Sequence, residues 1–135
     1  MADASPLPVL IYNFPGVSAG LDVNSEMLEK LGHHPNIVGV KLTCGGIAKV
    51  ARVRSQFEPE QFCALAGQSD WLLPAISVGG TGTITGLANI YPRVSNQIIF
   101  HPFPSHPSPL FFLKLVSNQL IRHVSSSTTS QLPAE

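Results

Sequence analysis

The sequence predicts an α/β fold in which helices cover a parallel sheet. Four short segments rich in apolar or small residues begin near residues 8, 37, 61 and 82, and their length and composition are typical of buried strands. Segments with apolar residues at helical spacing lie between them. Strands that alternate with helices along a chain pair in parallel, because each helix returns the chain to the same end of the sheet.

The first strand and helix have clear boundaries. An apolar run at residues 8–12 is followed by the turn-forming sequence at 13–16. A helix is then predicted to begin at a cap supplied by Asn24 or Asp22, whose side chains can accept from the first free amides of a helix. Gly32 ends this helix, since glycine adopts the conformation that follows a final helical turn at little cost.

The next elements continue the same alternation. Residues 37–42 form an apolar strand, and residues 47–57 carry apolar side chains at helical spacing. A third strand is predicted at 61–66, a helix at 69–77 and a fourth strand at 82–86. The intervals suit either the repeating units of a (β/α)8 barrel or an open doubly wound sheet, and periodicity alone does not choose between them.

The character of the chain changes after residue 93. Half of the twelve prolines follow residue 91, and proline lacks the amide proton that helices and central strands need. We therefore expect two parts, an α/β unit over 1–93 and a Pro/Ser-rich tail over 94–135, with one helix in the tail at 110–124.

Composition excludes several classes of protein. The 135 residues are 44% hydrophobic, so the chain can form a core, and eight basic residues balance eight acidic ones. Without net charge the chain has no field to attract nucleic acid, and no apolar run is long enough to span a membrane. Two cysteines and an N-terminus without signal-peptide character indicate a reduced, cytoplasmic location.

Lys41 is the most unusual residue, because it lies at the end of an otherwise apolar strand. A lysine in such surroundings loses hydration, which lowers its pKa and makes the amine nucleophilic toward carbonyl carbons. The carboxyl ends of parallel strands are also where α/β folds place their sites. The alternative is that the Lys41 stem packs against the strand end while its ammonium reaches water.

Tyr12 has the same placement at the end of the first strand. A phenol there can relay protons to a bound carbonyl compound. The alternative is a core aromatic residue whose hydroxyl has a hydrogen-bond partner. Two adjacent strands that each end in a proton-active residue favour a site more strongly than either residue does alone.

An ordered set of short motifs resembles one family, that of dihydrodipicolinate synthase and N-acetylneuraminate lyase, which are class I pyruvate-dependent aldolases on (β/α)8 TIM barrels. The motifs are Tyr12-Asn13-Phe14-Pro15-Gly16, Gly39-Val40-Lys41, Ala66-Gly67, Gly82-Thr83-Ile84 and Ala88-Asn89. By this resemblance the fold is a partial TIM barrel in which the four strands are strands five to eight. The segment after Pro15 lacks the arginine that the synthases use, and resembles fungal members that act on 4-hydroxy-2-oxoglutarate or 2-keto-3-deoxy sugar acids.

The resemblance also implies site residues. Lys41 matches the lysine that forms a Schiff base with pyruvate or another 2-keto acid, Tyr12 matches the proton-relaying tyrosine, and Ile84 matches a position that lines the pyruvate pocket. We expect neither a metal ion nor an organic cofactor, and a small, pyruvate-like 2-keto acid as the ligand.

Nothing in the chain matches the first four βα units of the family, including the Gly-Thr-Thr-Gly-Glu motif that grips the pyruvate carboxylate. Four units leave two unpaired sheet edges. We therefore expect either a lyase with impaired activity or a truncated, non-catalytic fragment. Such a fragment would associate with a second copy of itself, or with a paralogue, through the exposed barrel edges.

Overall fold

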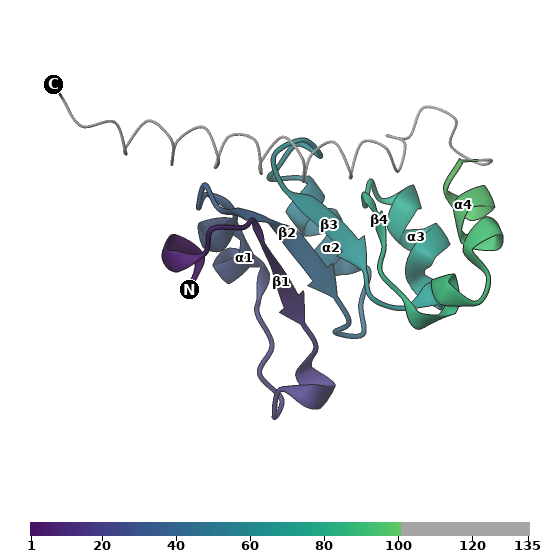
Figure 1. The fold of residues 1–135 in the computed structure, drawn as a ribbon, viewed down its shortest axis with the longest axis horizontal. Helices are drawn as coiled ribbons and strands as arrows, with labels where there is room; N and C mark the ends of the chain where they lie inside the picture. Colours follow the sequence, from purple (N-terminus) through teal and green to yellow (C-terminus); the bar gives the residue numbers. More distant parts are fainter. Residues whose placement is uncertain (101–135) are drawn as a thin grey trace, which may run out of the picture.

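A computed structural model describes residues 1–100 and contains the predicted parallel sheet (Figure 1). The strands run side by side in chain order, and all three pairings are parallel. Their bounds are β1 Val9–Asn13, β2 Ile37–Leu42, β3 Cys63–Ala66 and β4 Gly82–Thr83. The α/β class and the parallel sheet predicted from the sequence are therefore confirmed.

Helices follow the strands in the predicted alternation (Figure 1). They are α1 Ser25–Gly32, α2 Ala48–Arg54, α3 Leu72–Ser77 and α4 Pro92–Phe100. Asn24 caps α1 by accepting a hydrogen bond from the Met27 amide at 2.9 Å, which decides between the two caps that the sequence allowed. Helix α4 extends beyond residue 93, whereas the helix predicted at 110–124 lies outside the described residues.

Two strands are shorter than predicted. The third begins at Cys63 rather than at residue 61, because the amides of Gln61 and Phe62 both bond to the carbonyl of Glu58 and so belong to a turn. The fourth ends at Thr83, after which the Ile84 amide makes one more bond to β3 before the chain turns away.

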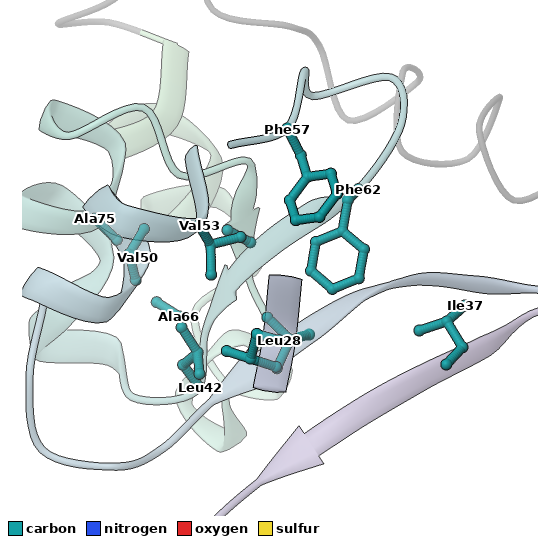
Figure 2. Packing of buried hydrophobic residues seen from close by; sticks show 11 residues of the cluster. Leu28, Ile37, Leu42, Val50, Val53, Phe57, Phe62, Ala66 and Ala75 are labelled. Atoms are coloured by element: carbon teal, nitrogen blue, oxygen red, sulfur yellow. The ribbon is translucent and has the colours of Figure 1, made fainter. Parts of the chain in front are cut away.

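The main hydrophobic core lies between the sheet and its helices (Figure 2). Leu28 of α1 and Val53 of α2 are fully buried there against strand residues such as Leu42. The rings of Phe57 and Phe62, which follow α2, pack with their centroids 5.0 Å apart. A smaller cluster of Cys63, Leu65 and Leu10 is made by side chains that alternate to the opposite face of the strands.

Close strand contact at the centre of the sheet requires glycine. A Cβ at Gly39 of β2 would lie 2.5 Å from the carbonyl oxygen of Cys63 on β3. The backbones of β2 and β3 can therefore approach only because position 39 has no side chain. This approach fixes the register in which Lys41 pairs with Leu65.

Candidate active site

Tyr12 and Lys41 meet at the carboxyl edge of the sheet. The two residues are partners in the register of β1 and β2, so their side chains leave the sheet on the same face. The Lys41 Nζ lies 4.0 Å from the centroid of the Tyr12 ring. An ammonium over an aromatic face is an attractive arrangement, and it places an amine beside a phenol.

Neither Lys41 nor Tyr12 is fully buried. Lys41 is half-buried, and it is the one residue of β2 that is not fully enclosed, so the loss of hydration expected for its amine is incomplete. Tyr12 is 52% exposed. The alternative interpretation of Tyr12 as a core aromatic residue is therefore wrong, because its ring faces the edge where ligands reach parallel sheets.

The environment of Tyr12 favours its ionised form. The nearby hydroxyl of Thr43 contributes most to lowering the pKa of the phenol below its ordinary value of 10.0, and Lys41 contributes further, against an opposing effect of burial. The hydroxyl of Thr43 approaches the phenol without the geometry of a formed hydrogen bond. Among residues 1–100, Thr43 Oγ1 is the buried side-chain polar atom that has no hydrogen-bond partner.

Ile84 lies at the same edge but not beside the other two residues. It follows β4, and its amide donates to the Ala66 carbonyl at 2.9 Å. Strand β3 separates it from Lys41 on β2. Its side chain is 40% exposed, so it presents an apolar surface at the carboxyl edge.

A buried polar network that sequence reasoning missed lies directly beneath this edge. Lys49 of α2 is buried, and its Nζ donates to Asp22 Oδ1 at 2.5 Å and to the Val23 carbonyl at 2.8 Å. Asn13, the last residue of β1, donates to the same Asp22 oxygen and accepts from the Val23 amide. These bonds lower the pKa of Asp22, chiefly through Lys49. The network ties the loop after β1 to α2 and fixes the residue that follows Tyr12.

The cysteines take no visible part in the site. Cys63 is buried, and the loss of hydration raises the pKa of its thiol to about 11, which keeps it protonated and inert. Cys44 packs against the core on the helix side of the sheet, away from the face that carries Lys41. Within residues 1–100, no three His, Cys, Asp or Glu side chains gather closely enough to hold a metal ion.

The arrangement has the parts that amine catalysis needs. A primary amine can attack a carbonyl carbon, and a phenol whose pKa is lowered can accept and return protons beside it. Both groups reach the open edge of the sheet, where a small ligand can approach.

Comparisons with known proteins assign the chain to a family. The sequence profile of the dihydrodipicolinate synthetase family matches residues 1–123, and the chain belongs to that family. The match extends beyond the motifs that carry the resemblance. The motifs from Tyr12 to Asn89 therefore identified the family correctly.

Two curated relatives illustrate the similarity. The chain is 50% identical over 99 residues to the probable 4-hydroxy-2-oxoglutarate aldolase, mitochondrial, of Emericella nidulans, which covers 73% of this chain and 32% of the relative. It is 39% identical over 105 residues to the L-threo-3-deoxy-hexylosonate aldolase of Hypocrea jecorina, which covers 73% of this chain and 33% of the relative. The chain thus spans about a third of the length of the curated relatives that it matches.

Solved structures agree with these relatives. A dihydrodipicolinate synthase family protein from Coccidioides immitis superposes with a TM-score of 0.67 at 32% identity, over 99% of this chain and 40% of that one. YagE, a prophage protein of the same family from E. coli K12 in complex with pyruvate, superposes with a TM-score of 0.68 at 25% identity, over 98% of this chain and 43% of that one. Within the described residues, no helix combines the length and the apolar character needed to cross a bilayer.

Proposed function

We propose that this chain carries the imine-forming half of a pyruvate-dependent class I aldolase, in which Lys41 is the Schiff-base lysine and Tyr12 relays protons. The observation that carries this proposal is the 4.0 Å approach of Lys41 Nζ to the Tyr12 ring at the carboxyl ends of paired strands. Membership of the dihydrodipicolinate synthetase family supports it.

The first chemical stage is formation of an iminium ion. The unprotonated Nζ of Lys41 attacks C2 of a 2-keto acid, and the carbonyl oxygen takes one proton from the nitrogen and one from the Tyr12 phenol and leaves as water. Tyr12 is then a phenolate. The nitrogen is left joined to C2 by a positively charged double bond, which attracts electrons more strongly than the original ketone does.

Cleavage follows if C4 carries a hydroxyl group. The Tyr12 phenolate takes the hydroxyl proton, the C3–C4 bond breaks to release an aldehyde, and its electron pair forms an enamine as the iminium electrons move to nitrogen. The enamine takes a proton at C3, and water then releases pyruvate and restores the amine. Condensation is the reverse of these steps.

The proposed substrates are 4-hydroxy-2-oxoglutarate or 2-keto-3-deoxy sugar acids. Two relatives are named for aldolases of these types. The loop after β1 supports this choice, because its residues 16–20 contain no cation that could hold a second carboxylate as the synthases do. We place Ile84 against the pyruvyl methyl group, and the four strands as strands five to eight of a (β/α)8 barrel.

Reduction with borohydride in the presence of pyruvate tests the proposal, because it converts a Schiff base into a stable amine. Peptide mass mapping should find the pyruvyl adduct on Lys41 and not on exposed Lys30 or on Lys49, whose Nζ is bound to Asp22. Lys41→Arg keeps the charge but lacks a nucleophilic amine, so it should abolish the adduct, whereas Lys30→Arg should leave it unchanged. A folded parent chain that forms no adduct on Lys41 contradicts the proposal.

A second function, association without catalysis, is favoured by one feature of the sheet. Strand β1 pairs only with β2 among the described residues, so the other edge of its five residues is free to pair. A second copy of the chain is the occupant that we propose. Sedimentation should then give a dimer mass that Leu10→Pro reduces to a monomer. The Val9 amide bonds to Asn36 beside β2, so the Leu10 amide, which alternates with it, faces the free edge and is the donor that proline removes. A parent chain that sediments as a monomer contradicts this proposal.

The place in the cell where the chain acts is also a proposal. A cytoplasmic location is the prediction from the sequence, whereas the Emericella nidulans relative carries "mitochondrial" in its name. Cell fractionation with an antibody to the chain distinguishes the two locations. We predict recovery in the cytosolic fraction, and recovery with mitochondria would contradict this prediction.

A further inference from the structure

Thr43 is the polar side chain at the carboxyl edge that the chemistry above leaves unused. It follows β2 directly, two residues after Lys41, and its backbone amide donates to the Asn13 carbonyl at 2.9 Å. Thr43 is therefore held against the end of β1. Because Lys41 is the register partner of Tyr12, Thr43 two residues later lies on the same face of the sheet, and its hydroxyl is one of the groups near the Tyr12 phenol.

The hydroxyl of Thr43 is enclosed and has no established partner. In the described part of the chain, its Oγ1 is buried without a hydrogen bond. Buried hydroxyl groups nearly always have a hydrogen-bond partner, since a buried hydroxyl without one destabilises the fold. The Thr43 hydroxyl can therefore donate a hydrogen bond to a negatively charged acceptor that forms beside it.

Gly67 closes the other side of Thr43. A Cβ at Gly67 would lie 1.8 Å from Thr43 Oγ1, and the Gly67 amide donates to the Leu42 carbonyl at 2.8 Å. The end of β3 is thus packed directly against the hydroxyl. The hydroxyl therefore lies between the end of β3 and the end of β1, the strand that carries Tyr12.

We propose that Thr43 is a positioning residue that acts through Tyr12: its hydroxyl donates a hydrogen bond to the phenol oxygen when that oxygen becomes negatively charged. The bond holds the ionised ring beside Lys41, where the proton relay of the proposed aldolase needs it. The inference rests on that proposed function for its role, but the contact itself does not depend on catalysis. Hydrogen bonds to an ionised group stabilise that form.

The phenol of Tyr12 can be titrated by itself. The chain has two tyrosines, Tyr12 and Tyr91, so Tyr91→Phe leaves Tyr12 as the single phenol whose ultraviolet absorbance changes on ionisation. In this background the pKa of Tyr12 should lie below 10.0. Lys41 is the charged side chain that lies over the Tyr12 ring in the described residues, and it is retained in every variant.

Three substitutions then isolate the hydroxyl. Thr43→Val removes it at nearly constant shape and should raise the pKa of Tyr12 toward 10.0, whereas Thr43→Ser should restore the parent value. Thr81→Val is the matched control, because it removes a hydroxyl that bonds to the Ala64 carbonyl, and it should leave the titration unchanged. If Thr43→Val does not fold, Thr43→Ala makes the same comparison with a smaller side chain.

The outcomes separate this inference from the proposed function. An unchanged Tyr12 pKa in Thr43→Val or Thr43→Ala overturns it, even if the parent chain forms a pyruvyl adduct on Lys41. A raised pKa that Thr43→Ser reverses supports it, even if no adduct forms. Where the adduct does form, Thr43→Val should slow its formation at neutral pH, and Thr43→Ser should recover the rate.

Discussion

Replacement of Lys49 by methionine tests the buried network beneath the site. Methionine keeps most of the apolar stem of lysine but has no ammonium, so Lys49→Met removes the bond to the Val23 carbonyl and the ion pair with Asp22. A hydrogen bond from a charged group contributes about 1.5–3 kcal/mol. The ion pair adds about 0–1 kcal/mol, because the Asp22 side chain is 47% exposed.

Relief of the buried charge offsets part of this loss, so we expect the free energy of unfolding to fall by about 2 kcal/mol. For a domain of this size the melting temperature should drop by about 10 °C. Thermal unfolding followed by circular dichroism measures the change, and Lys30→Met, which alters an exposed lysine of α1, is the control.

A double-mutant cycle with Asp22→Asn then separates the ion pair from the carbonyl bond. The coupling between the two substitutions should be about 1 kcal/mol or less. A melting temperature of Lys49→Met equal to that of the parent would refute the claim that this network anchors the loop after β1.

Three further predictions concern stability. Phe62→Ala should lower the free energy of unfolding by about 3–5 kcal/mol, because Phe62 is fully buried against Phe57; urea denaturation measures it, and a loss below about 1 kcal/mol would contradict the packing. Gly39→Ala should cost about 1–3 kcal/mol, since its Cβ would meet the Cys63 carbonyl oxygen, and an unchanged urea midpoint would refute that contact. The pKa of folded Asp22 lies below 3.8, so its contribution is complete above pH 3.8 and is lost as pH falls through the folded pKa. The stability difference between parent and Asp22→Asn should therefore shrink in acid, and a difference independent of pH would count against the bond to Lys49.

The sequence predicted the alternating elements because their signals are local. Apolar runs end at turn-forming residues, and the helical spacing of residues such as Val50 and Val53 needs only near neighbours to be recognised. The place of Lys41 near the end of β2 was also predictable, because one charged residue at the end of an apolar run is visible without a structure.

The polar contacts of the site could not be predicted in the same way. Lys49 and Asp22 are 27 residues apart, and their meeting depends on how the loop after β1 folds back onto α2. Asn13 was interpreted as part of a turn, yet it ends β1 and is buried. The approach of Thr43 to Tyr12 likewise depends on the register of two strands, and no short-range pattern encodes that register.

Pyruvate labelled with carbon-13 at C2 gives the most direct test of the claim that Lys41 and Tyr12 form a keto-acid site. Nuclear magnetic resonance of the labelled carbon in the presence of the chain should show a signal of an imine carbon in addition to that of the free ketone. The signal should vanish in Lys41→Arg and persist in Lys30→Arg. Spectra of the folded parent and of Lys41→Arg that are identical would contradict the claim.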